Sequence, residues 1–317
     1  MRTPIGGFFE IETGNNPTGI PYHSGAEALS SGRGCLAAIL KSTSPKRIWM
    51  PHYICDAALG PCREAGVEIL FYPIDKNLDP VFGEMAPGDK VLYVNYFGLK
   101  DERSAQIARK FGEAAVIDAT QSFFIKGWCD SYLFNSARKF FGVADGAYLY
   151  SPRSLASDWP RNENPSTKHL YLRIEGRQCE AFAEYQRAEN EIDLVPRRIS
   201  TFSETMLRER IDYKEAMARR VANSLVYHEL LASKNSLQIP LNGDAPFCYP
   251  FLPAVEVPRQ ALYSREIFPP QLWKDCLARE IPQWERALCT NLLPLPVDHR
   301  YGEAECRYVA KEVLACL

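Results

Sequence analysis

Short apolar runs alternate with helix-like segments between about residues 30 and 150. The apolar runs have the length of strands and lie at residues 47–50, 67–72, 91–95, 114–118, 131–134 and 147–150. Helix-like segments at residues 55–65 and 101–111 lie between some of these runs. Strands that alternate with helices at this spacing predict an α/β fold, with a mostly parallel sheet and helices on both of its faces.

The pattern changes after Pro152. Residues 153–168 are rich in Ser, Pro and Asn and predict a loop, which is followed by long helical tracts at about residues 169–192 and 203–233. From residue 238 onward, Pro-rich connections separate short strands, and a final helix is expected over residues 302–317. We therefore predict a large domain over residues 1–199 and a smaller α+β domain over residues 200–317.

The composition is that of an ordinary globular protein. Of the 317 residues, 46% are apolar and 24% are charged, and 37 Lys and Arg residues against 39 Asp and Glu residues leave a net charge of −2. No segment is rich in Lys and Arg. This balance argues against binding to the phosphate backbone of nucleic acids, so we expect no nucleic-acid partner.

The cysteines and the N-terminal residues indicate the cellular compartment. The ten cysteines are scattered and form no C-x-x-C pair, so we expect reduced thiols and neither a disulfide framework nor a metal site. The N-terminal apolar patch is short and is soon followed by Glu10 and Glu12, unlike a signal peptide. No run approaches the roughly 18 apolar residues of a membrane helix, and we expect a cytoplasmic protein without a membrane partner.

The first candidate for chemistry is the glycine-rich segment Ser31-Gly32-Arg33-Gly34, which leads directly into an apolar helix. Backbone N–H groups and the helix dipole favour an anion at a helix start. The Arg33 guanidinium would add a bidentate phosphate contact. Taken alone, however, the same segment is more typical of an ordinary glycine turn with a serine cap.

Two further candidates follow predicted strands, where ligands bind in open parallel sheets. Asp118 ends an apolar strand and can project into a cleft, although an Asp here often caps a turn. Lys139 follows the next strand, among Phe134, Phe140 and Phe141. Loss of solvation in such surroundings would lower the pKa of a lysine, as an amine nucleophile requires. The alternative is a lysine that reaches to solvent beside core aromatics.

Together, these three features are the parts needed to hold pyridoxal phosphate. The glycine segment would bind the phosphate, and Lys139, 21 residues after Asp118, would form the Schiff base. The acid would keep the pyridinium nitrogen protonated, so that the ring can act as an electron sink. Pyridoxal phosphate is therefore the predicted cofactor.

Four motifs extend this interpretation to a family. They are Ser31-Gly32-Arg33-Gly34, Asp118-Ala-Thr-Gln121, Ser136-Ala-Arg-Lys139 followed by Gly142 and Asp145-Gly146, and a late segment with Pro296, Asp298, Arg300 and Tyr301. With them the chain resembles the fold-type-I pyridoxal-phosphate enzymes, and among these the DegT/DnrJ/EryC1/StrS sugar aminotransferases. The resemblance is strongest over residues 30–150. It implies a mostly parallel sheet of the seven-stranded type, flanked by helices.

The resemblance also implies roles for individual residues, in particular the catalytic residues Lys139 and Asp118. Lys139 would carry the cofactor and later move a proton, Asp118 would pair with the pyridinium nitrogen, and Gln121 would bind the phenolic oxygen. The groups expected to hold the phosphate are Gly32, Arg33, Gly34 and Ser136. An aromatic ring would stack on the cofactor, with Tyr53 as our choice and His52 as its rival, although Tyr53 is equally typical of a packing aromatic. Tyr22-His23 would either line the same region or form a turn.

The predicted activity is transfer of an amino group from an amino-acid donor, with glutamate as a candidate, to a keto group. By resemblance the acceptor is a nucleotide-linked sugar, as in polysaccharide biosynthesis, and the protein is a homodimer. Two other functions remain open from the sequence. One is elimination or dehydration on a sugar, which some relatives perform after replacing the lysine, and the other is a non-catalytic protein that retains the cofactor fold.

Overall fold

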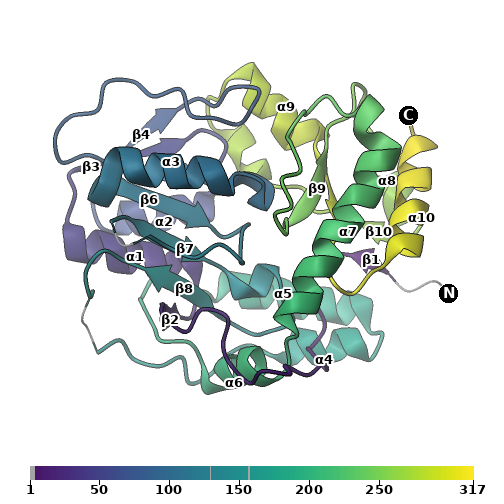
Figure 1. Ribbon diagram of the computed structural model, residues 1–317, viewed down its shortest axis with the longest axis horizontal. Coiled ribbons are helices and arrows are strands. Elements are labelled where there is room, and N and C mark those ends of the chain that lie inside the picture. Colours follow the sequence, from purple (N-terminus) through teal and green to yellow (C-terminus); the bar gives the residue numbers. More distant parts are fainter. Residues whose placement is uncertain (1–3, 129, 156–157) are drawn as a thin grey trace.

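A seven-stranded sheet forms the centre of the molecule (Figure 1). The computed structural model describes residues 4–128, 130–155 and 158–317. The strand order is β2-β8-β7-β6-β5-β3-β4. These strands are β2 (Glu27–Leu29), β3 (Arg47–Pro51), β4 (Glu68–Tyr72), β5 (Lys90–Val94), β6 (Ala115–Ala119), β7 (Tyr132–Asn135) and β8 (Ala147–Tyr150).

Most neighbouring strands are parallel, as the sequence predicted. The pairs β4/β3, β3/β5, β5/β6 and β6/β7 are parallel, whereas β8 runs antiparallel to both β7 and β2. Because β8 is reversed against both of its neighbours, β2 runs in the same direction as β7. The carboxyl ends of β2, β3, β5, β6 and β7 therefore lie along one edge of the sheet. The loops that carry the predicted functional residues leave from this edge.

Helices cover both faces of the sheet. Figure 1 shows α3 (Asp101–Phe111) on one face and α1 (Gly32–Thr43) and α2 (Asp56–Glu64) on the other. The central strands β5 and β6 are buried along their whole length, as expected for parallel strands covered on both sides. Three short 3-10 helices occur in the loops: η1 (Tyr96–Gly98), η2 (Gly112–Ala114) and η3 (Ala137–Lys139). The predicted fold class is confirmed.

Each of the two long helical tracts predicted after residue 168 is a pair of helices. The first is α4 (Lys168–Ile174) and α5 (Gln178–Asn190), separated at Gly176, whose φ of +78° cannot continue a helix. The second is α6 (Thr201–Glu209) and α7 (Tyr213–Leu231). There, Asp212 begins α7 by accepting a hydrogen bond from the Glu215 N–H at 3.0 Å.

The C-terminal part adds two small sheets. Strands β9 (Cys248–Phe251) and β11 (Leu293–Pro296) pair antiparallel, and β10 (Ile267–Phe268) pairs in parallel with β1 (Ile5–Gly6). The other elements here are η4 (Ala232–Lys234), α8 (Arg259–Tyr263), η5 (Lys274–Ala278), α9 (Gln283–Asn291) and α10 (Glu303–Leu314). A domain boundary near residue 200 stays a prediction, and β1 pairs across it.

The N-terminal segment (residues 5–12) joins this C-terminal part to the loop after Lys139. The Tyr301 hydroxyl accepts the Gly6 N–H at 2.8 Å, and the Arg300 guanidinium donates to Phe8 O at 3.0 Å. The predicted late motif therefore has a structural role, because two of its residues hold the N-terminal segment in place.

The other end of this segment lies directly against Gly142. The Gly142 N–H donates to Glu12 Oε1 at 2.9 Å, and the Glu12 N–H donates to Gly142 O at 3.3 Å. A Cβ at position 142 would come within 1.6 Å of Glu10 O, so the close approach of the two backbones requires glycine here.

Within the described residues, no helix combines the length and the apolar character needed to cross a membrane. The nine cysteines in the same ranges are free thiols, and Cys129 lies outside the described residues.

Candidate active site

The residues predicted to carry the chemistry meet around Thr120, just after β6. Lys139 Nζ donates a hydrogen bond to Thr120 Oγ1 at 2.9 Å, and the Thr120 N–H donates to Asp118 Oδ1 at 2.9 Å. A Cβ on Gly32, the first residue of α1, would lie 3.1 Å from Thr120 Cγ2 and 3.5 Å from the Phe134 ring. The structure therefore brings Lys139, Asp118 and Gly32 to one place at the carboxyl edge of the sheet.

Gln121 is held so that one of its polar atoms points to no protein partner. Its Oε1 accepts the Phe97 N–H at 2.8 Å, which identifies Nε2 as the remaining donor. Nε2 is buried, and in the described part of the chain it has no hydrogen-bond partner. Such an unpaired donor costs about 1–3 kcal/mol. A bound acceptor at this point would remove that cost.

The loop that fixes Gln121 has an unusual backbone. Phe97 is fully buried and has a φ of +62°, which is rare for a residue with a side chain. Gly98 follows with a φ of +71°, and a Cβ there would lie 2.3 Å from Gln121 O. The Gln121 amide is therefore positioned by a close-fitting backbone turn and not by a flexible side chain.

Three groups are available to bind an anion at the start of α1. The N–H groups of Gly32 and Arg33 lie in the first turn of the helix, where no intrahelical acceptor exists. Ser136 occupies the N-cap position of η3, but its hydroxyl makes no capping hydrogen bond. The Gly34 N–H, in contrast, donates to Ser31 Oγ at 3.0 Å. The Gly34 N–H is therefore already bonded to the N-cap residue Ser31, and its predicted contribution to the anion site stays a prediction.

The Arg33 side chain also differs from the prediction. Its guanidinium donates to Glu189 O at 3.3 Å and to Ile192 O at 3.1 Å, and forms an ion pair with the Glu189 carboxylate at 3.7 Å. These acceptors surround the C-terminal end of α5, where carbonyl groups and the helix dipole attract a cation. The Arg33 backbone N–H, in contrast, remains available for the predicted phosphate contact.

Glu189 connects this arginine to the lysine loop. Arg138, directly before Lys139, forms an ion pair with the same carboxylate. Burial alone would raise the pKa of Glu189, but the charges of Arg138, Arg33 and Lys139 hold it below its usual range. One carboxylate on α5 therefore neutralises cationic side chains from both loops of the site.

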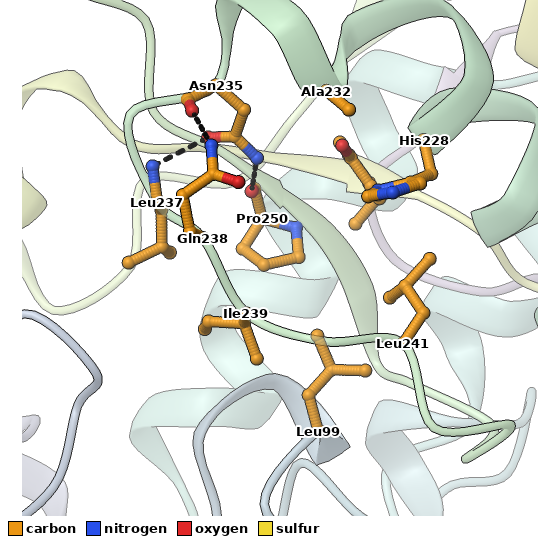
Figure 2. A pocket seen from close by; sticks show the side chains of 10 residues that line it. Leu99, His228, Ala232, Asn235, Leu237, Gln238, Ile239, Leu241 and Pro250 are labelled. Atoms are coloured by element: carbon orange, nitrogen blue, oxygen red, sulfur yellow. Dashed lines mark hydrogen bonds between the residues drawn. The ribbon is translucent and has the colours of Figure 1, made fainter.

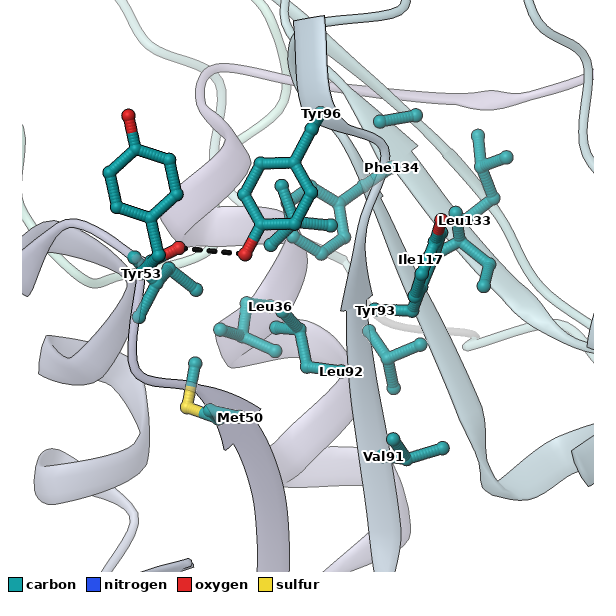
Figure 3. Close-up of a cluster of buried hydrophobic side chains, with 14 of the residues drawn as sticks. Leu36, Met50, Tyr53, Val91, Leu92, Tyr93, Tyr96, Ile117, Leu133 and Phe134 are labelled. Carbon is teal, nitrogen blue, oxygen red and sulfur yellow. Dashed lines mark hydrogen bonds between the residues drawn. The ribbon is translucent and has the colours of Figure 1, made fainter. Parts of the chain in front are cut away.

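Tyr53, the residue predicted to stack on the cofactor, is packed among other aromatic side chains. Its ring is fully buried, stacked on Tyr96 with centroids 5.6 Å apart and edge-on to Trp273 at 4.5 Å. In addition, the Tyr96 hydroxyl donates to Tyr53 O at 2.9 Å (Figure 3). The rival His52 stacks on Phe71 at 5.3 Å. Both rings are therefore packed against aromatic neighbours, and stacking of either on a cofactor stays a prediction.

Two residues near the site had no role in the sequence analysis. Burial raises the pKa of the Cys55 thiol; the charge of Lys139 lowers this pKa and that of Asp118 raises it, so Cys55 lies near both residues. Thr120 is the other. The only available signal was its place inside the Asp118-to-Gln121 motif, whereas a cysteine at a helix start carries no specific signal.

Tyr22 and His23 were expected either to line the site or to form a turn. The structure shows that they lie in a packed turn. The two His23 ring nitrogens contact the Tyr150 hydroxyl at 2.8 Å and Phe123 O at 2.7 Å. Burial lowers the pKa of His23 to about 3. His23 is therefore a neutral structural residue at physiological pH.

His23 predicts an acid-sensitive stability. The unfolded chain binds a proton at this residue below its ordinary pKa of about 6.5, whereas the folded protein does so only near pH 3. Stability is therefore lost as the pH falls below 6.5, and His23 contributes a loss of about 2 kcal/mol between pH 7 and pH 5. Urea unfolding of the wild type and of His23→Gln at both pH values measures this. An equal loss in both proteins would contradict the assignment.

A small hollow elsewhere is not part of this site. It lies between η1 and the end of α7, and its lining includes Leu99, His228, Asn235 and Gln238 (Figure 2). The Asn235 amide donates to Pro250 O at 2.9 Å, and its Oδ1 accepts the Leu252 N–H at 2.8 Å. The Gln238 amide donates to Asn235 O. These polar groups hold the surrounding loops, and none of the predicted residues lines the hollow.

Known structures share this arrangement of elements. A DegT DnrJ EryC1 StrS aminotransferase from Brucella abortus has a TM-score of 0.62 and 16% identity, over 92% of this chain and 85% of that protein. NtdA from Bacillus subtilis, with bound cofactor PMP, has a TM-score of 0.64 and 13% identity over 92% and 73%. DesI, in the presence of its TDP-sugar product, has a TM-score of 0.60 and 15% identity over 92% and 80%.

The sequence matches no protein-family model and no curated protein. The likeness in structure shows that the chain has the fold of the fold-type-I pyridoxal-phosphate enzymes. In particular, it shares the fold of the DegT/DnrJ/EryC1/StrS aminotransferases, as its motifs predicted.

Proposed function

We propose that the protein is a pyridoxal-phosphate-dependent aminotransferase that moves an amino group from an amino-acid donor to a keto group. The observation that carries this proposal is the meeting of Lys139, Asp118 and the unpaired Gln121 amide at the carboxyl edge of the sheet. The fold supports it, because NtdA has the same fold and was solved with PMP bound.

The residues present fit this cofactor. Lys139 would carry its aldehyde carbon, Asp118 would face the pyridinium nitrogen, and Gln121 Nε2 would donate to the phenolic oxygen. The N–H groups of Gly32 and Arg33, together with the Ser136 hydroxyl, would hold the phosphate. Bound there, pyridoxal phosphate supplies an electron sink for the substrate carbon.

The chain's own residues then divide the work. The free Lys139 amine would accept a proton from the substrate carbon and donate it to the neighbouring cofactor carbon. The Asp118 carboxylate would favour the protonated form of the pyridine nitrogen. Gln121 would orient the cofactor ring through an amide that is itself fixed by the Phe97 N–H.

For the acceptor we propose the keto group of a nucleotide-linked sugar, with glutamate as the donor. This rests on the sugar-related neighbours of the fold, among them DesI with its TDP-sugar product. We also propose that the protein acts as a homodimer in the cytoplasm and that its other partners are small molecules.

A spectroscopic experiment tests the reaction class. Addition of pyridoxal phosphate to the purified protein should give a visible absorbance band, and glutamate should shift this band to that of the amine form while 2-oxoglutarate accumulates. If glutamate and a range of other amino acids leave the band unchanged, transamination is excluded. Product analysis with a keto sugar nucleotide then separates amino transfer from dehydration.

A further inference from the structure

A hydroxyl group lies between the two residues proposed to carry the reaction. Thr120 Oγ1 accepts a hydrogen bond from Lys139 Nζ at 2.9 Å, and the Thr120 N–H donates to Asp118 Oδ1 at 2.9 Å. Thr120 is therefore the one residue that bonds to both of them, in the part of the chain that the structure describes. Its backbone is fixed by the aspartate, and its side chain contacts the lysine.

The other branch of the Thr120 side chain limits its orientation. Its methyl group, Cγ2, faces Gly32 so closely that a Cβ on Gly32 would lie only 3.1 Å away. A β-branched residue has few favourable χ1 angles, and this methyl contact selects among them. With the methyl group against α1, the hydroxyl is directed toward Lys139. Gly32 therefore provides room for Thr120 as well as a backbone N–H.

We propose that Thr120 is a positioning residue for the Lys139 amine, an inference that rests on the proposed function. A lysine side chain has about 2 kcal/mol of rotamer entropy, and a fixed acceptor reduces the number of positions that Nζ samples. A neutral amine that donates one N–H to Thr120 keeps its lone pair for an electrophile. Thr120 thus acts on the free amine, before the cofactor is bound covalently and again after the incoming amino group releases Lys139.

The step that depends on this position is formation of the imine. The neutral Nζ adds to the aldehyde carbon of pyridoxal phosphate, and both amine hydrogens leave with the carbonyl oxygen as water. A carbon–nitrogen double bond replaces the carbon–oxygen double bond, with no change in oxidation state. The rate of this step reports the placement of Nζ without any turnover of substrate.

Two variants separate the hydroxyl from the methyl group. Thr120→Val keeps the shape and the contact with Gly32 but removes the acceptor, whereas Thr120→Ser keeps the acceptor without the methyl group. Cofactor-free protein is mixed with saturating pyridoxal phosphate, and imine formation is followed by stopped-flow absorbance. We expect Thr120→Val to be about tenfold slower, as for the loss of one hydrogen bond, and Thr120→Ser to stay within about threefold of the wild type.

Binding of 4′-deoxypyridoxine 5′-phosphate, which has no aldehyde, provides the control. Its affinity should agree within about twofold among the three proteins, because positioning of Nζ does not affect a ligand that forms no imine. An unchanged imine rate in Thr120→Val, or a parallel loss of affinity for the deoxy compound, would overturn the positioning role. A wild-type protein that forms no imine at Lys139 would instead overturn the proposed function, and this inference with it.

Discussion

Replacement of Lys139 by alanine is expected to abolish covalent attachment of pyridoxal phosphate and to lower the rate of amino transfer by about a thousandfold or more. The variant loses both the amine that binds the cofactor aldehyde and the base that moves the substrate proton. Borohydride reduction followed by peptide mass spectrometry measures attachment, and initial rates with glutamate measure transfer.

Lys90 offers a matched control for this experiment. Burial lowers the pKa of its amine to about 8, and Nζ donates to Glu113 O at 2.6 Å. By its pKa alone Lys90 would be a good nucleophile, but it begins β5 and therefore lies at the opposite edge of the sheet. The Lys90→Ala variant should still carry the cofactor adduct on Lys139 and should transfer amino groups at the wild-type rate per folded molecule. If the borohydride-reduced cofactor adduct were found on Lys90, or on any residue other than Lys139, the site assignment would be wrong.

Asp118→Asn is expected to retain the cofactor but to transfer amino groups about a hundredfold to a thousandfold more slowly. The asparagine Oδ1 can still accept the Thr120 N–H, so the turn after β6 is kept. The variant loses the negative charge that would hold the proton on the pyridinium nitrogen, and removal of one partner of a buried ion pair costs about 3–5 kcal/mol. Single-turnover kinetics with glutamate, together with the cofactor content, measure both effects.

Asp89 is the corresponding control for the aspartate. It is buried near the amino end of β5, where Arg47 and Trp49 donate hydrogen bonds to it at 2.8 and 3.0 Å. Asp89→Asn should lower the unfolding free energy while leaving the single-turnover rate unchanged. If Asp118→Asn transferred amino groups at the wild-type rate, the assignment of Asp118 to the pyridinium nitrogen would be wrong.

The sequence predicted the sheet well because its strands are short apolar runs separated by helices. The smallest strands were missed, since β1 and β10 have two residues each and β2 has three, too few to show a hydrophobic period. The helical tracts were placed correctly but were drawn too long. Their breaks at Gly176 and Asp212 depend on single residues within otherwise helical patterns.

The sequence predicted which site residues meet wherever their location depends only on their position along a strand. Asp118, Gln121 and Lys139 lie together because parallel strands end at one edge of the sheet. Side-chain directions were not predictable, because they depend on partners far away in the sequence. Arg33 turns toward Glu189, and Tyr53 packs against Trp273. No local pattern around residues 33 or 53 contains that information.

The N-terminal segment has a consequence for the order in which the protein is completed during synthesis. Gly6 bonds to Tyr301, 295 residues later in the chain. At about 5–20 residues per second, the ribosome needs roughly 15–60 s to make the intervening chain. Until then, Gly6 and Phe8 lack their bonds to Tyr301 and Arg300, and the segment has only its earlier partners, among them Arg173 and Gly142. We therefore expect the N-terminal segment to reach its final position only after the central sheet, near the end of translation.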